Sequence, residues 1–195
     1  MRKILLAAAL CLMVLPALAQ TPVSESNPDP KKIDDDFVHQ QFGDQFTYIS
    51  SIGAASGDLD GDGVEDVVIA ARCKNPMADK DEYSFVIADP YDTFLGYGDV
   101  KVTSTFASDA PERRGVSLLI IHGAEKDAWR ADKPKAKFLM INLPFKTVTV
   151  KRLAIKKKTV LGIYMEEVGE GESTSSVLFW DGKKYKYMQL GSTLE

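Results

Sequence analysis

Cysteine and histidine are scarce in this chain, with two of each among 195 residues. Cys11 lies in an N-terminal apolar stretch that we expect to be removed, so Cys73 would have no partner for an intramolecular disulfide. We expect Cys73 to be a packed, inert thiol, because the sequence shows no neighbouring base that would activate it. These shortages exclude a disulfide-stabilised scaffold and a zinc site built from a Cys/His cluster.

Common catalytic motifs are missing too. The chain contains neither Gly-x-Ser-x-Gly nor His-Glu-x-x-His. We therefore expect a protein that is not an enzyme. A hydrolase whose catalytic carboxylates are far apart in the sequence stays open, because such a pair is recognised only in three dimensions.

The chain also lacks a hydrophobic run of membrane-spanning length. The longest run, Ile4–Leu15, is shorter than the roughly 20 residues that a transmembrane helix needs. Arg2 and Lys3 precede this run and Ala17-Leu18-Ala19 follows it, which is the pattern of a signal peptide over residues 1–19. We expect a secreted or periplasmic protein without a membrane span, whose mature chain begins at Gln20.

Acidic residues outnumber basic ones overall, but not everywhere. Removal of Arg2 and Lys3 leaves 22 basic residues against 28 acidic ones, a net charge of about −6, which argues against a nucleic-acid partner. The segment 133–158 carries basic residues and no acids. We interpret it as solvated strand surface, although an anionic partner such as an acidic polysaccharide or a phospholipid headgroup is the alternative.

Short strand patterns separated by turns fill most of the mature chain. Residues 20–29 have the composition of a flexible leader, and residues 30–195 have the length of a single domain. Asp29, Pro30 and Gly43 frame a short N-terminal helix. About nine strands with little helix indicate an all-β, antiparallel domain, either a sandwich or an incomplete propeller-like stack of sheets. The clearest strand patterns are Phe46–Ile52, Val67–Arg72, Tyr83–Ala88, Val116–Ile121, Phe138–Leu143, 147–150, Thr159–Met165, 176–180 and 185–188.

Aromatic residues mark two further features. Asp181-Gly182 indicates a hairpin with a two-residue turn. In that register four side chains share one face and contribute to the core; they are Leu178, Trp180, Tyr185 and Tyr187. The segment 89–99 is expected to be a loop with three aromatics, which either pack against the body of the domain or grip a ligand.

The stretch Gly57–Ala71 carries the most specific pattern in the chain. Asp58, Asp60 and Asp62 occupy every second position, and Asp66 follows at the ninth position of the loop. Calcium takes six to eight oxygen ligands, and a curling chain can present alternate carboxylates to it. Gly63 supplies the residue that tolerates a positive φ after the third aspartate. The spacing predicts a calcium loop at residues 58–66 rather than a magnesium site.

The loop departs from the EF-hand pattern and resembles another. Position twelve is Ile69 instead of a glutamate, and Val67-Val68-Ile69 predicts a strand rather than a helix. This combination resembles the calcium loops of FG-GAP and VCBS-type repeats of exported proteins. The resemblance implies one Ca²⁺ ion held by Asp58, Asp60, Asp62, the backbone carbonyl of Val64, and Asp66. No second aspartate ladder follows, so a single repeat is expected.

Three functional hypotheses follow. The first is an exported calcium-binding β-rich module with a structural or ligand-binding role, whose ligand is an extracellular protein or glycan. The second is a calcium-stabilised envelope hydrolase with an unidentified catalytic site. The third is an interaction module that works through the aromatics of segment 91–97.

Overall fold

The computed structural model describes residues 32–96, 114–168 and 173–193. The predicted signal peptide and leader, and Asp29 and Pro30, lie outside these residues. The described chain forms ten strands in two sheets, with two α-helices. The elements are α1 (Asp35–Phe42), β1 (Phe46–Tyr48), β2 (Ala54–Gly57), β3 (Asp66–Cys73), β4 (Val86–Ala88), α2 (Pro90–Leu95), β5 (Val116–His122), the 3₁₀ turn η2 (Glu125–Asp127), β6 (Ala136–Met140), β7 (Thr147–Ile155), β8 (Lys158–Val168), β9 (Ser173–Trp180) and β10 (Tyr185–Thr193).

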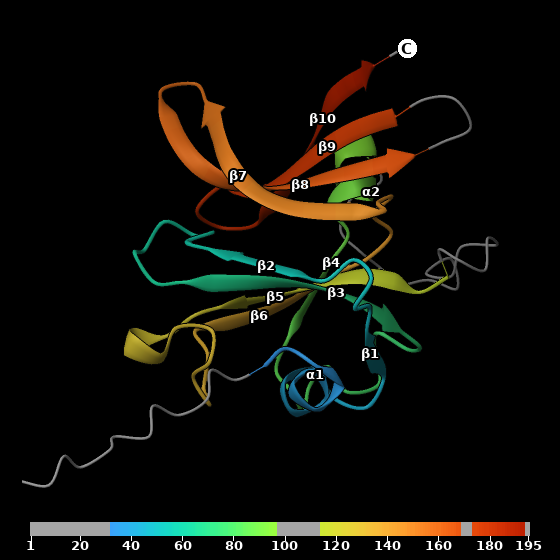
Figure 1. The fold of residues 1–195 in the computed structure, drawn as a ribbon, viewed down its shortest axis with the longest axis vertical. Coiled ribbons are helices and arrows are strands. Elements are labelled where there is room, and N and C mark those ends of the chain that lie inside the picture. Colours follow the sequence, from blue (N-terminus) through green and yellow to red (C-terminus); the bar gives the residue numbers. More distant parts are fainter. Residues whose placement is uncertain (1–31, 97–113, 169–172, 194–195) are drawn as a thin grey trace, which may run out of the picture.

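The two sheets pack face to face, so the predicted all-β class is confirmed and its sandwich form is the one observed (Figure 1). The larger sheet has the order β1-β3-β5-β6-β4, and β2 pairs with the same edge of β3 as β1. The smaller sheet has the order β10-β9-β8-β7 and is antiparallel throughout. In the larger sheet one pair, β4 with β6, is parallel. Helix α1 lies on the outer face of the larger sheet as a third layer.

Strands β3 and β5 lie at the centre of the larger sheet and are buried on both faces. Val67 and Ile69 of β3 point toward α1, whereas Val68 points toward the smaller sheet. Such strands carry nearly continuous apolar runs instead of alternating ones, because neither face meets water. The Val67–Ile69 and Val116–Ile121 runs therefore form the centre of the molecule.

Helix α1 is shorter than predicted. It ends at Gly43 as expected, with φ +96, but it begins at Asp35 because Asp34 is its N-cap. The Asp34 carboxylate accepts a hydrogen bond from the Phe37 N–H at 3.0 Å. Phe37 and Phe42 are buried against the larger sheet.

The segment 89–99 is not a loop in its first part, so that prediction is wrong. Residues 90–95 form α2, whose N-cap Asp89 accepts a hydrogen bond from the Asp92 N–H at 2.8 Å. Tyr91 and Phe94 pack on Tyr187 of β10, with ring centroids 5.1 and 5.3 Å apart. The aromatics of this helix thus attach it to the smaller sheet; Tyr97 lies outside the described residues.

The hairpin of β9 and β10 has a four-residue turn rather than the predicted two-residue one. Trp180 pairs with Tyr185, and residues 181–184 form the connection. The Asp181 carboxylate accepts hydrogen bonds from the N–H groups of Lys183 and Lys184, which lengthens the turn. The predicted shared face is nevertheless present, because the rings of Trp180 and Tyr185 contact each other with centroids 5.1 Å apart, and both pack in the inter-sheet core.

Candidate metal centre

The aspartate-rich loop connects β2 to β3 at one end of the larger sheet. The two strands are antiparallel and their ladder closes at the pair Gly57 and Asp66, so the loop is the tip of a hairpin. Gly61 and Gly63 have φ values of +80 and +88, and no atom lies within 4 Å of the place where a Cβ would stand. These glycines are required by the backbone conformation and not by crowding.

Three carboxylates converge in this loop. One oxygen from each of Asp58, Asp60 and Asp62 lies within 4.8 Å of the other two. Asp58 accepts hydrogen bonds from the N–H groups of Gly61, Asp62 and Gly63 at 2.8, 3.0 and 3.0 Å, so the backbone wraps around its side chain. The N–H of Val64 donates to Asp62 at 2.8 Å. The donor set consists of carboxylate oxygens, which suits a hard cation such as Ca²⁺.

Asp66 occupies a different position from the other three aspartates. Its side chain is 1 % exposed, and its oxygens accept three backbone hydrogen bonds, from Leu59 at 2.7 Å, Asp60 at 3.2 Å and Gly123 at 2.8 Å. Burial raises its pKa to about 6 in spite of these donors. One oxygen of Asp66, one oxygen of Asp60 and one ring nitrogen of His122 lie within 4.8 Å of one another. Asp66 therefore fastens the base of the loop to the end of β5.

Lys135 provides a cation at the mouth of the loop. Its Nζ lies 2.7 Å from an Asp60 oxygen and 2.6 Å from an Asp62 oxygen. The hydrogen bond from Lys135 is the main reason that the pKa of Asp62 is lowered, and the same two carboxylates raise the pKa of Lys135. A divalent ion that binds these two oxygens has to displace the ammonium group.

His122 joins the loop to the inter-sheet core. Its Nδ1 lies 3.3 Å from the Asp60 carboxylate, and its Nε2 lies 2.7 Å from the Tyr185 hydroxyl. Burial lowers the pKa of His122, although the nearby Asp60 opposes this shift. The imidazole thus bridges a loop carboxylate to a phenol of the smaller sheet. This contact makes the position of Asp60 depend on both sheets.

Glu65 is turned away from the three converging carboxylates. Ser56 donates to it at 2.7 Å, and the Trp129 Nε1 and an Arg130 nitrogen each lie 3.1 Å from its other oxygen. These donors lower the pKa of Glu65, with the Ser56 hydrogen bond as the largest cause. Glu65 therefore serves to hold η2 and the residues after it against the hairpin.

The structure places each sequence-predicted site residue as follows. Asp58, Asp60 and Asp62 are brought together; Val64 follows them in the loop; Asp66 lies at the base, beside Asp60. Lys135, His122 and Tyr185 also belong to this site, and the spacing of the aspartates did not reveal them. Lys135 lies within the acid-free segment 133–158, which was the one available signal.

Cys73 lies apart from this site. Its thiol is buried in the layer between α1 and the larger sheet, and burial raises its pKa to about 12. A thiol with such a pKa is protonated at neutral pH and is a poor nucleophile.

No family model, no curated protein and no solved structure matches the chain. In the parts that the structure describes, no helix combines the length and the apolar character needed to cross a bilayer. The functional conclusion therefore depends on the residues of the site itself.

Proposed function

We propose that this chain is an exported β-sandwich module that binds one Ca²⁺ ion in the loop 58–66, in the manner of the FG-GAP and VCBS-type loops that it resembles. The convergence of the Asp58, Asp60 and Asp62 oxygens within 4.8 Å carries this proposal. These three carboxylates and the Val64 carbonyl are the proposed ligands. Asp66 is the fifth group in the resemblance; it is buried at the base of the loop and bonded to the Gly123 N–H outside the loop, which favours a positioning role beside the ion.

The role of the ion in this proposal is structural in the first place. Without a cation, three carboxylates at this separation repel one another, and Lys135 can pair with only two of them. A loop of this kind in an extracellular protein has a dissociation constant on the order of 10⁻⁴–10⁻³ M. At a free calcium concentration one hundred times this dissociation constant, binding would stabilise the folded chain by about 2.7 kcal/mol.

The test is a thermal melt of the mature protein with calcium, with magnesium and with a chelator. We expect calcium to raise the midpoint by about 5–10 °C at a hundredfold excess over the dissociation constant. Magnesium at the same concentration should raise it less, because Mg²⁺ prefers fewer protein ligands and keeps its waters. Equal midpoints with calcium and chelator would refute the proposal.

A pair of matched variants assigns the effect to the loop. Asp62→Asn removes one proposed ligand from an exposed position, so the calcium-dependent shift should be lost while the melt in chelator stays close to that of the parent protein. Asp81→Asn makes the same chemical change at an exposed aspartate outside the loop and should keep the full shift. A full shift in the Asp62→Asn protein would place the ion elsewhere.

A further inference from the structure

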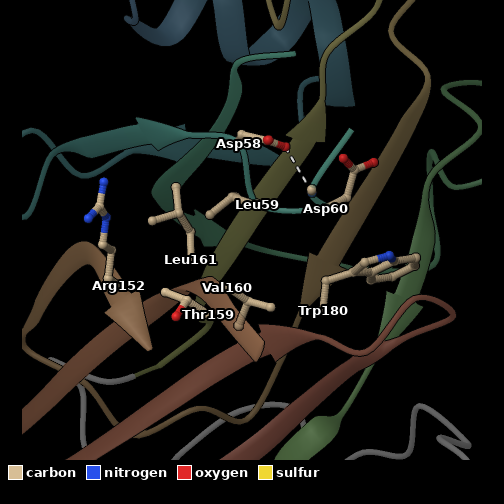
Figure 2. Close-up of a pocket in the computed structure, with 9 residues that line it drawn as sticks. Asp58, Leu59, Asp60, Arg152, Thr159, Val160, Leu161 and Trp180 are labelled. Atoms are coloured by element: carbon tan, nitrogen blue, oxygen red, sulfur yellow. Dashed lines mark hydrogen bonds between the residues drawn. The ribbon is translucent and has the colours of Figure 1, made fainter. Parts of the chain in front are cut away.

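A cavity of about 350 Å³ opens between the calcium loop and the smaller sheet (Figure 2). Residues 58–61 form one wall. The other wall comes from β7, β8 and β9, through Arg152, residues 159–161 and Trp180. Its size is within the range of small-ligand pockets, and its lining combines apolar side chains with a few polar groups, which is the usual composition of such pockets.

The proposed ion would border this cavity directly. Asp58 and Asp60 line the cavity and are also two of the proposed ligands. The loop supplies four oxygens in the proposed arrangement, because Asp66 is buried at the base of the loop and takes the positioning role. Calcium takes six to eight oxygens, so roughly two to four positions are left for water or for a ligand.

Trp180 forms an apolar platform in the same cavity. Its half-buried indole is packed by His122, Phe138 and Tyr185, with ring centroids 5.1, 5.4 and 5.1 Å away. These neighbours fix the orientation of the indole before any ligand arrives. A fixed indole next to Val160 and Leu161 suits the apolar face of a sugar ring.

Arg152 adds a cation on the opposite side of the cavity from Trp180 (Figure 2). Its side chain is exposed, and it lies in the segment 133–158, which has no acidic residue. A guanidinium group binds a carboxylate through two parallel hydrogen bonds. The cavity therefore offers a site for hydroxyl oxygens at the ion, an apolar surface at Trp180 and a carboxylate partner at Arg152.

We propose that this cavity binds a uronic-acid residue of an acidic polysaccharide in a calcium-dependent manner. The proposal rests on the calcium site proposed above. A sugar ring presents an apolar face, adjacent hydroxyls and a carboxylate on one rigid frame, and these three features match the three parts of the cavity. An acidic peptide has carboxylates for the ion and for Arg152 but no comparable ring, so it leaves the apolar surface at Trp180 unmatched.

Titration of trigalacturonate into the mature protein at a buffered free calcium concentration tests this inference. Calcium binding is measured first by calorimetry, without the sugar. Trp129→Phe removes the second of the two tryptophans, so that Trp180 fluorescence reports occupancy of the cavity. We expect a saturable change in calcium and none in chelator, in the parent protein by calorimetry and in the Trp129→Phe protein by fluorescence.

Variants and comparison ligands complete the test. Arg152→Gln should weaken trigalacturonate binding about tenfold, because glutamine can replace only one of the two hydrogen bonds and carries no charge. It should leave calcium affinity within about twofold. Lys157→Gln removes a positive charge from the turn between β7 and β8, away from the cavity lining, and should bind like the parent protein. Maltotriose, which has no carboxylate, and triglutamate, which has no sugar ring, should both bind much more weakly.

The outcomes separate the two proposals. Calcium binding without trigalacturonate binding would overturn the inference about the cavity and leave the calcium site standing. Absence of calcium binding would overturn both. Equal binding of trigalacturonate in chelator, or equal binding of maltotriose or triglutamate, would overturn the inference that ion, indole and guanidinium act together on one acidic sugar.

Discussion

Lys135 controls how readily the aspartate loop can accept a cation. Its ammonium group contacts Asp60 and Asp62, two of the three carboxylates proposed to bind calcium. Because ion and ammonium compete for the same oxygens, every calcium ion that binds must break both contacts. The side chain is 49 % exposed, so solvent weakens each contact.

We expect Lys135→Gln to tighten calcium binding by roughly fivefold, since an exposed ion pair contributes at most about 1 kcal/mol. Calorimetric titration of the variant and the parent protein at low ionic strength measures this change. Lys133→Gln is the control and should leave calcium affinity unchanged. Lys133 is an exposed lysine of the same segment, and among the described hydrogen bonds it makes none to the loop. Weaker calcium binding in the Lys135→Gln protein would show that the ammonium group supports the site.

Cys73 provides a second prediction for a single residue. Its buried thiol, with a pKa of about 12, should resist alkylation by iodoacetamide at pH 8 in the folded protein. The same cysteine should react completely in urea, where it is exposed. Mass spectrometry of both reactions measures the modified fraction. Rapid modification of the folded protein would show that the layer between α1 and the larger sheet opens easily.

Residue identities revealed only part of the site. Asp58, Asp60 and Asp62 could be recognised from the sequence because they stand two positions apart within one short loop. His122, Lys135 and Tyr185 could not be found in this way. The fold brings His122 and Lys135 to Asp60 from 62 and 75 positions away, and Tyr185 to His122 from 63 positions away. The spacing also includes Asp66, but its bond to the N–H of Gly123, directly after β5, was not predictable from the sequence.

At the scale of elements, the central strands were the most predictable. The runs around Val68 and Ile120 are apolar on both faces, and burial on both sides is the reason. The short helix α2 was missed, although Asp89 as N-cap, Pro90 at the first position and Gly96 at the end are ordinary helix signals.

Asp181, in the turn between β9 and β10, should make the stability of the fold depend on pH. The pKa of Asp181 is lowered to about 2, first by the Lys184 N–H, then by the Lys183 N–H and by Lys186. A folded-state pKa below the ordinary value of 3.8 means that Asp181 stabilises the fold above about pH 4 and loses this effect as the pH falls toward 2. The loss should stay below about 1 kcal/mol because solvent reaches the turn.

Asp181→Asn tests this prediction. The amide oxygen can still accept both backbone hydrogen bonds, but the charge and the ion pair with Lys186 at 3.0 Å are gone. We expect the free energy of unfolding, measured by urea titration between pH 2 and 5, to depend less on pH in the variant. Asp81→Asn, the same change at an exposed aspartate away from this turn, is the control and should keep the pH dependence of the parent protein. An unchanged pH dependence would mean that Asp181 titrates alike in the folded and unfolded chain.

At the scale of the whole molecule, the aspartate-rich loop is attached to the core at its base and exposed at its tip. Asp66 and His122 are buried, whereas Gly61 and Asp62 are exposed. Local opening of the tip should therefore be frequent without an ion, and global unfolding should be rare. Strands β3 and β5, buried between α1 and the smaller sheet, are expected to be the slowest to exchange their amide hydrogens.

Hydrogen exchange with calcium and with chelator distinguishes these motions. In calcium at a hundredfold excess, we expect exchange of the Gly61, Asp62 and Gly63 amides to slow by up to about a hundredfold, because the ion must leave before the tip opens. The Lys183 and Lys184 amides, which are bonded to Asp181 in another turn, should exchange at the same rate in both conditions, since that turn opens locally without disturbing the loop. Equal slowing in both turns would mean that calcium acts on the whole fold, and unchanged rates in the loop would mean that the ion does not bind there.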